Sequence, residues 1–258
     1  MQVWQSALLA KIPGVVHGVS TRLGGVSRPP FATLNCSLQT GDRVEDVIEN
    51  RRRLLTWLGF GLDAAVWGEQ VHGAVVRRVT RRDATTEEGA HARGFPGTDG
   101  LVTTQQGLAL MAFFADCLPI IAAEEGGRAA GVAHAGWRGT IAGVARQLIA
   151  SLRECGVPPE RIKVALGPCI KPCCYEVSEE LYQRFSNEIG PQAVGRTRSG
   201  RPALDLARAN TALLVRSGVP ESAIEVSSLC TACRTDLFFS HRAERGNTGR
   251  FVAVVGLL

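Results

Sequence analysis

Two histidines and one cysteine of this chain lie next to turn signals, where a folded scaffold can present side chains to a cleft. His72 lies in a loop bounded by glycines, Cys117 lies between two apolar runs, and His134 ends a third apolar run. Imidazole and thiolate ligands suit zinc, and three protein ligands with an open fourth position form the catalytic pattern of zinc enzymes. These residue types therefore predict a metal site of His72, Cys117 and His134.

The same three residues also allow interpretations without a metal. His72 could be a loop histidine in water, Cys117 a small buried apolar side chain, and His134 a hydrogen-bonded core residue. The three positions are far apart in the sequence, so no local spacing motif decides the question. A metal-free alternative with chemistry is a cysteine hydrolase, in which Cys117 is the nucleophile and His134 or His72 its base.

Five other cysteines gather in two short segments of the C-terminal half: Cys169, Cys173, Cys174, Cys230 and Cys233. The last two form a C-x-x-C pair, and a partner pair could complete a structural zinc site. The other three form C-x₃-C-C instead of a second C-x-x-C, so packed thiols are the competing interpretation. Disulfides are not expected in a reducing compartment.

Charged residues near these segments are candidates for substrate contacts. Asp116 is the carboxylate nearest to the three ligands in sequence, and it could orient a ligand histidine or transfer a proton. Four arginines lie in glycine-rich or turn-rich segments, where guanidinium groups can bind phosphate or carboxylate: Arg22, Arg138, Arg242 and Arg245. Surface solubility is the alternative role for each of them.

Composition places the chain among ordinary globular proteins. It has 258 residues, of which 45% are hydrophobic and 21% charged, so a disordered chain is excluded. The net charge of +5 is mild and does not require nucleic acid as a partner. No apolar run approaches the roughly 18 residues of a membrane-spanning helix, and the first twenty residues lack a secretory pattern. We therefore expect a cytoplasmic protein without a membrane partner.

Hydrophobic periodicity predicts the elements that position these residues. Helices are expected at 42–58, where Asp42 and Glu45 resemble a capping box, at 140–154, from Ser178 onward, and at 205–217. The arginines at 51–53 are assigned to the solvated face of the first helix. Buried strands are expected at 100–104, 108–114, 118–123, 129–133, 161–166, 224–226 and 251–257.

The order of these elements indicates the fold class. Strands and helices interleave without a regular βαβ count, and no linker divides the chain. We therefore expect an α/β (α+β) fold, a single domain of mixed β-sheets layered with helices over residues 1–258. The polar stretch 77–100 is assigned to a surface loop. The glycine fingerprints of dinucleotide-binding and P-loop proteins are absent from the sequence.

Several motifs together resemble the YfiH family, also called laccase-domain or polyphenol oxidase proteins. They follow one another from about residue 14 to the C-terminus: GVSTRLGGVS, GEQVHG, GTDGLVT, ADCLPI, AHAGWRGT, GPCIKPCCYEV, FFSHR and TGR. The resemblance implies a cytoplasmic enzyme with a fold of mixed sheets and helices. It also implies a zinc ion, which would be held by His72 in QVHG, Cys117 in ADC and His134 in HAGWRG.

The activity that the resemblance implies is purine nucleoside phosphorolysis with adenosine deamination as a side activity. The substrates would be phosphate and adenosine, inosine, guanosine or methylthioadenosine. Arg22 and Arg138 would hold the phosphate, and Asp116 would contact substrate or assist proton transfer. The family's older name suggests a copper-dependent polyphenol oxidase, so copper is the alternative metal. A multicopper cluster requires paired H-x-H motifs, however, and no two histidines of this chain have that spacing. A module that binds a ligand without turnover is the non-enzymatic alternative.

Overall fold

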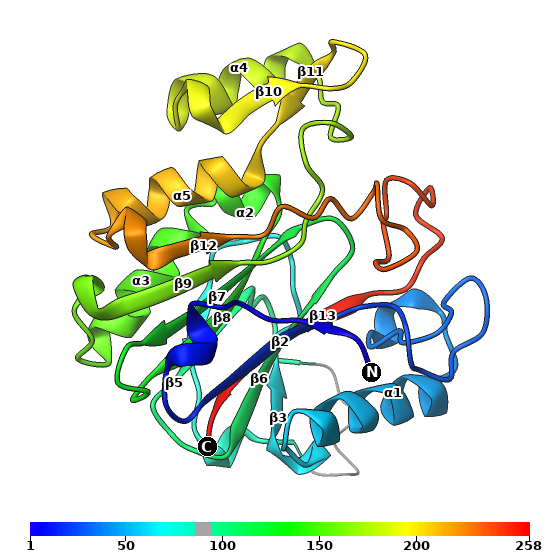
Figure 1. Cartoon of the computed structure of the whole chain (residues 1–258), viewed down its shortest axis with the longest axis vertical. Coiled ribbons are helices and arrows are strands. Elements are labelled where there is room, and N and C mark those ends of the chain that lie inside the picture. Colours follow the sequence, from blue (N-terminus) through cyan, green and yellow to red (C-terminus); the bar gives the residue numbers. More distant parts are fainter. Residues whose placement is uncertain (86–93) are drawn as a thin grey trace.

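The computed structural model describes residues 1–85 and 94–258, and two β-sheets form its centre (Figure 1). The five-stranded sheet has the order β1 (Val3–Trp4), β2 (Val15–Ser20), β13 (Phe251–Leu257), β6 (Leu108–Phe114) and β3 (Ala65–Trp67). The six-stranded sheet has the order β12 (Ile224–Val226), β9 (Ile162–Leu166), β7 (Leu118–Glu124), β8 (Ala130–Ala135), β5 (Gly100–Thr103) and β4 (Val76–Arg78).

The two sheets pack face to face, and helices cover their outer faces. Side chains alternate along β6: Leu108 and Leu110 join the apolar layer between the sheets, whereas Ala109 and Met111 pack toward α1 (Val44–Trp57). This period of two is what a strand buried on both faces requires. On the other side, α2 (Trp137–Ala142), α3 (Val144–Glu154) and α5 (Leu206–Arg216) cover the six-stranded sheet. The result is a four-layered arrangement with an apolar core between each pair of layers.

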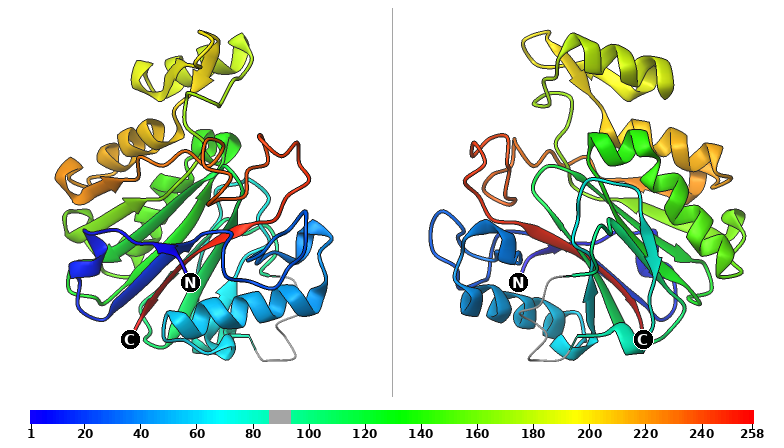
Figure 2. Two further views of the ribbon diagram at one scale, coloured as in Figure 1. Left: turned by 45° about the vertical axis from the view of Figure 1, so that its right-hand side comes forward. Right: turned by 180° about the vertical axis from the view of Figure 1, so that it is seen from behind.

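A small subdomain extends from this body. It consists of α4 (Glu179–Glu188) and the hairpin of β10 (Val194–Arg196) and β11 (Pro202–Leu204), which lie apart from the sheets in both views of Figure 2. Short 3₁₀ helices connect other elements: Leu9–Lys11, Leu38–Thr40, Leu62–Ala64, Arg81–Asp83, Pro159–Arg161, Pro191–Ala193 and Glu221–Ala223. Within the described ranges, no helix is long and apolar enough to cross a membrane.

The structure confirms the predicted fold class and most of the long elements. One predicted helix, 140–154, is two helices, because Gly143 has a φ of 86° and interrupts α2 and α3. The predicted capping box is also wrong, since the N-cap residue is Arg43 and Asp42 instead accepts a hydrogen bond from Asn35. The stretch 77–100 contributes part of β4 and a 3₁₀ turn, and its residues 86–93 lie outside the described residues.

Arg51 contradicts its assignment to a solvated helix face. It is only 2% exposed, and its guanidinium lies over the rings of Trp67 and Phe113 at 4.6 and 4.9 Å from their centroids. Arg51 follows Val47 by four residues and precedes Leu54 by three, so it lies on the apolar stripe of α1. The helical spacing therefore indicated a buried position for Arg51, but the prediction followed the charge of the three consecutive arginines instead.

Candidate metal centre and substrate cavity

His72, Cys117 and His134 come together where the two sheets meet. His72 lies in the loop that follows β3, Cys117 in the turn that leads from β6 to β7, and His134 near the end of β8. One ligand atom from each residue lies within 4.8 Å of the other two. The β6–β7 turn passes from one sheet to the other, so the thiol is placed between the two histidines. Three positions that are remote in sequence thus form one group of donors.

Asp99, which the sequence analysis did not select, links both histidines. Its Oδ1 accepts from His134 Nδ1 at 2.9 Å, and the side chain of Asp99 is fully buried. The same carboxylate accepts backbone N–H bonds from Val71, His72 and Gly73 at 2.8 to 3.1 Å. Because a carboxylate only accepts, the His134 proton is on Nδ1 and Nε2 is left for another partner. The motif GTDGLVT contained Asp99, but nothing in it indicated this role.

The electrostatics of the group favour a thiolate at Cys117. Burial opposes ionisation of the thiol, but the charges and hydrogen bonds of His134 and His72 outweigh it and lower its pKa to about 6. Burial likewise lowers the pKa of His134, but the neighbouring Cys117 and Asp99 outweigh it and raise that pKa to about 9. In the absence of a metal, a thiolate therefore faces an imidazolium near neutral pH.

The donor set fits a zinc-like ion. Two imidazoles and one thiolate are the ligand types that zinc and copper prefer, and a hydrogen-bonded carboxylate behind one histidine is typical of zinc sites. Gly136 provides the space, since a Cβ there would lie 3.0 Å from both Cys117 Sγ and His72 Cδ2. His72 itself has a φ of 61°, so the backbone of its loop adopts a left-handed conformation rare for residues other than glycine.

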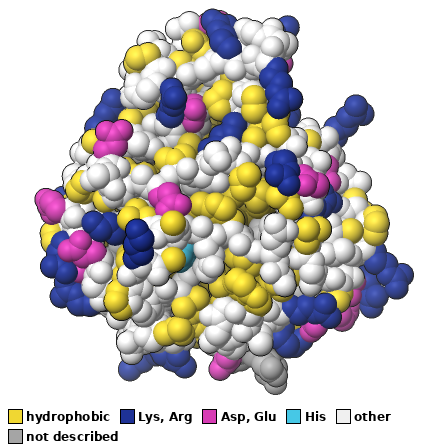
Figure 3. All heavy atoms as spheres, viewed as in Figure 1, with side chains coloured by type: hydrophobic (Ala, Val, Ile, Leu, Met, Phe, Trp, Pro, Cys, Tyr) yellow, Lys and Arg dark blue, Asp and Glu magenta, His cyan; other side chains and the backbone are white. Residues whose placement is uncertain are grey.

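A cavity of about 800 Å³ opens beside this group. Its wall contains the three donor residues together with aromatic side chains and arginines: Arg51, Trp67, Phe113, Trp137, Arg138, Tyr175, Arg242 and Arg250. Ligand cavities of roughly 300–1,000 Å³ with a few convergent polar groups suit small molecules. On the face drawn in Figure 3, Lys and Arg side chains are scattered among acidic ones instead of forming a continuous patch.

The structure separates the two arginines expected to bind phosphate. Arg138 lines the cavity, stacks on Trp137 at 4.5 Å, and has no carboxylate partner among the described residues. Arg22 does not belong to the described residues that line the cavity, because its guanidinium donates to Glu244 at 2.9 Å and to two backbone carbonyls. The expectation for Arg22 is therefore revised to a structural ion pair. Arg242 lines the cavity, whereas Arg245 is not among the described lining residues.

Asp116 lines the cavity, but its oxygens are already occupied. Oδ1 accepts from the hydroxyls of Thr231 and Ser240 at 2.6 and 2.7 Å, and Oδ2 accepts from the backbone N–H of Arg242 at 2.7 Å. Its φ of 87° is unusual for a residue with a side chain. Asp116 therefore ties the 227–250 segment to the turn that carries Cys117, while Asp99 orients the histidine.

Comparisons with known proteins agree with this structure. Residues 16–258 match the family model described as "Multi-copper polyphenol oxidoreductase laccase". Purine nucleoside phosphorylase YlmD of Geobacillus stearothermophilus is 44% identical over 248 residues, which cover 94% of this chain and 90% of YlmD. A protein named adenosine deaminase RL5, from an unknown prokaryotic organism, is 32% identical and covers 91% of each chain.

Solved structures give the same relationship. The crystal structure of YlmD from Geobacillus stearothermophilus matches with a TM-score of 0.90 at 42% identity, covering 98% of this chain and 94% of that one. The crystal structure of the Bacillus licheniformis hypothetical protein YfiH matches with a TM-score of 0.88 at 37% identity, covering 95% of this chain and 93% of that one. These matches confirm the resemblance that the motifs carried. The chain belongs to the YfiH family, whose model is described as multi-copper polyphenol oxidoreductase laccase.

Proposed function

We propose that this protein is a zinc-dependent purine nucleoside phosphorylase that also deaminates adenosine. The observation that carries the proposal is the convergence of His72, Cys117 and His134 within 4.8 Å at the wall of a cavity that also contains arginines. Relatives named for each of the two activities cover nine-tenths or more of this chain. Adenosine, inosine, guanosine and methylthioadenosine are the proposed nucleosides, and the cytoplasm is the proposed compartment.

Zinc is the proposed ion, and His72, Cys117 and His134 would hold it. When bound, a zinc ion with an open position acts as a Lewis acid toward water or a substrate oxygen. Asp99 would keep the His134 ring in the tautomer that offers Nε2, and Gly136 would leave room for the thiol beside His72. Copper shares this preference for imidazole and thiolate, but a multicopper cluster would need further histidines.

In phosphorolysis, a phosphate oxygen bonds to ribose C1′ while the bond from C1′ to the purine nitrogen breaks. The electrons of that bond leave with the purine, which must gain a proton or an equivalent hydrogen bond. Arg138 and Arg250 are suited to hold the phosphate, because both line the cavity and neither is paired with a carboxylate among the described residues. Tyr175 and Trp137 offer aromatic surface in the same cavity for the purine ring.

A cysteine-dependent hydrolase is the second candidate, and one observation favours it. Cys117, His134 and Asp99 form a chain of thiol, imidazole and carboxylate like that of a nucleophilic triad. In that mechanism the ring of His72 beside the thiol would have no assigned task, since one imidazole suffices as base. A third donor next to the thiol therefore favours the metal.

One assay separates these functions. Metal-quantified wild-type protein is incubated with adenosine and phosphate, and products are resolved by chromatography beside His72→Ala and Cys117→Ala. We expect adenine with ribose 1-phosphate, or inosine, from the wild type, and neither product nor zinc at this site in the variants. Asp63→Asn, a change at an exposed position, should retain the wild-type turnover and the zinc. Full turnover by His72→Ala without metal would contradict the metal mechanism and favour the hydrolase, and no turnover by zinc-loaded wild type would favour a binding module.

A further inference from the structure

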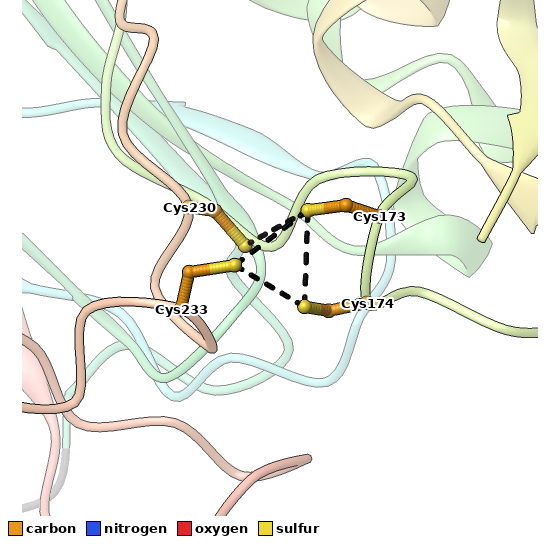
Figure 4. A group of neighbouring side chains, drawn as sticks. All are labelled: Cys173, Cys174, Cys230 and Cys233. Carbon is orange, nitrogen blue, oxygen red and sulfur yellow. Dashed lines mark hydrogen bonds between the residues drawn. The ribbon is translucent and has the colours of Figure 1, made fainter. Parts of the chain in front are cut away.

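Four cysteines outside the candidate metal centre form a second cluster (Figure 4). Cys173 and Cys174 lie in the loop after β9, and Cys230 and Cys233 lie in the loop after β12. The two strands are parallel neighbours, so their C-terminal ends meet at the same edge of the sheet. The sequence motifs C-C and C-x-x-C are thereby brought together although they lie far apart in the chain. In Figure 4 the four thiols point toward a common centre.

The spacing of the sulfur atoms matches a tetrahedral site. Cys173 Sγ lies 3.7 Å from Cys174 Sγ, 3.8 Å from Cys230 Sγ and 3.7 Å from Cys233 Sγ, and Cys174 Sγ lies 3.4 Å from Cys233 Sγ. All four sulfurs lie within 4.8 Å of one another. A regular tetrahedron with zinc–sulfur bonds of about 2.3 Å has sulfur–sulfur edges of about 3.8 Å. The four sulfurs therefore already have nearly the separations that a zinc ion would impose.

Donor groups around the cluster are suited to thiolates. The backbone N–H of Lys171 donates to Cys230 Sγ at 3.4 Å, and the guanidinium of Arg198 donates to Cys233 Sγ at 3.3 Å. Such N–H bonds to ligand sulfurs are the outer-shell contacts that stabilise negative charge on a metal site. Arg198 comes from the turn of the β10–β11 hairpin, whose backbone also donates to the carbonyl of Cys173. The cationic side chain partly offsets the net −2 charge of a zinc ion with four thiolates.

Cys169 is not part of this cluster. It is fully buried in the apolar core under the six-stranded sheet, and its backbone pairs with that of Cys230 in an isolated bridge. The five cysteines of the two segments thus divide into four that face one another and one that packs in the core. This division could not be made from the C-x₃-C-C spacing.

We infer that Cys173, Cys174, Cys230 and Cys233 bind a structural zinc ion, separate from the ion of the proposed catalytic site. Binding converts four thiols to thiolates and releases four protons to solvent, with no change of oxidation state. Four sulfur ligands and no open position are typical of structural zinc, and tetrahedral sulfur ligation separates this site from magnesium, calcium or square-planar copper.

The position of the cluster gives the ion a task. Cys230 precedes Thr231, whose hydroxyl donates to Asp116 at 2.6 Å, directly before Cys117 in the chain. Cys174 precedes Tyr175, which lines the cavity. An ion bound by both loops would therefore hold two walls of the cavity together. In this respect the site would act like a cross-link between loops that are irregular over most of their length.

Metal content tests the inference without any activity measurement. Protein purified with zinc present and without chelator is analysed by elemental mass spectrometry. We expect two zinc ions per chain in the wild type, one in His72→Ala, one in the double variant Cys173→Ser/Cys233→Ser, and two in Cys155→Ser, a cysteine outside both clusters. The zinc that the double variant retains reports that its fold is intact.

A second measurement covers the case in which the double variant does not fold. In His72→Ala loaded with cobalt(II), we expect the strong near-ultraviolet thiolate-to-cobalt absorption of a four-sulfur tetrahedral site, and Arg198→Ala should weaken zinc binding in a chelator competition. A single zinc in the wild type that the double variant retains in full, loss of all zinc in His72→Ala, or iron instead of zinc at the four thiols would overturn the inference. None of these results depends on nucleoside turnover, so failure of the proposed activity would be seen separately.

Discussion

Oδ1 of Asp99 lies 2.9 Å from Nδ1 of His134, and the same atom also accepts the backbone N–H of His72 at 3.0 Å. One buried oxygen thus fixes the ring of one proposed ligand and the backbone of the other. Burial raises the pKa of this carboxyl, but the hydrogen bonds from His134 and from the backbone outweigh it, so the net pKa is lowered and Asp99 stays ionised. The carboxylate is a positioning group for the pair of histidines.

Asp99→Asn should weaken zinc binding at the catalytic site. The carboxylate accepts four N–H bonds, whereas an amide offers one acceptor oxygen and points an NH₂ group at backbone donors. Loss of a carboxylate that orients a ligand histidine typically weakens metal binding 10–100-fold, so we expect the zinc affinity of Asp99→Asn to fall by about 10–100-fold. Chelator competition measures the affinity, with Asp63→Asn as the control. An unchanged affinity would mean that the histidines are held by other contacts.

Gly136→Ala should displace the thiol or the imidazole without unfolding the protein. The new Cβ would lie 3.0 Å from Cys117 Sγ and from His72 Cδ2, closer than ordinary van der Waals contact. Gly73→Ala is the matched control in the same neighbourhood, where the nearest atom is 3.4 Å away. We expect zinc content to fall in the first variant and to remain in the second, at similar thermal stability. Equal zinc content in both would show that the pocket tolerates the methyl group.

Alkylation of metal-free protein should report the lowered pKa of Cys117. The thiolate is the nucleophile, so the rate of modification by iodoacetamide follows its fraction. With a pKa of about 6, the rate at Cys117 should reach half its plateau near pH 6. Cys155 is the internal control, because burial raises its pKa and its rate should still be rising at pH 9. In His134→Gln the midpoint of Cys117 should move upward, and a midpoint near 9 in the wild type would refute the ion pair.

The long elements could be predicted from the sequence because their local signals are strong. The runs that became β6, β7 and β13 are apolar on both faces, and Ser178 and Asp205 cap α4 and α5 through their side chains as N-cap residues do. β1 and β3, with two and three residues, are too short to show a period and were not predicted, although the equally short β12 was. Only their pairing with longer strands defines them.

The candidate site shows a different limit. Residue types beside turn signals and motif resemblance both selected His72, Cys117 and His134, but the residues alone could not show that three remote turns meet. Arg22 shows the same limit, since its ion-pair partner Glu244 lies on a segment that the sequence does not connect to it. Contacts of this kind are decided by tertiary structure, and no local pattern contains them.

Glu124→Gln should destabilise the fold in a pH-dependent way. The side chain of Glu124 is fully buried, and its pKa is about 2 because hydrogen bonds from Arg128, Arg161 and the backbone outweigh the opposing effect of burial. The lowered pKa corresponds to a stabilisation of the folded state by up to about 3 kcal/mol. We reduce this to about 2 kcal/mol because both arginines are partly exposed and solvent screens their charges. This contribution is present above the unfolded pKa and is lost as the pH falls through the folded pKa.

Urea unfolding at pH 7 and pH 3.5 measures this difference. We expect the free energy of unfolding of the wild type to exceed that of Glu124→Gln by about 2 kcal/mol at pH 7 and by only about 1 kcal/mol at pH 3.5. Glu125→Gln is the control, since Glu125 is partly exposed and its ion pairs with Arg161 and Lys163 are long. A difference that did not shrink in acid would mean that packing, not charge, is responsible.

Arg138→Ala should weaken phosphorolysis much more than deamination. Phosphorolysis needs a bound phosphate, and deamination of adenosine does not. A hydrogen bond to a charged group contributes about 1.5–3 kcal/mol, so losing the guanidinium should raise the KM for phosphate by about 10–100-fold. The KM for adenosine in deamination should change far less, because that reaction binds no phosphate and the ring of Trp137, on which Arg138 stacks, remains in the cavity.

Arg153→Ala is the control for this experiment, because Arg153 lies on the exposed side of α3, away from the described residues that line the cavity. Initial rates are measured for both reactions over a range of phosphate concentrations. If Arg138→Ala lowered both activities equally, its side chain would serve the fold or the nucleoside, and Arg250 would remain as the candidate phosphate ligand. If neither changed, the phosphate would lie elsewhere in the cavity, and Arg242 would be the next residue to substitute.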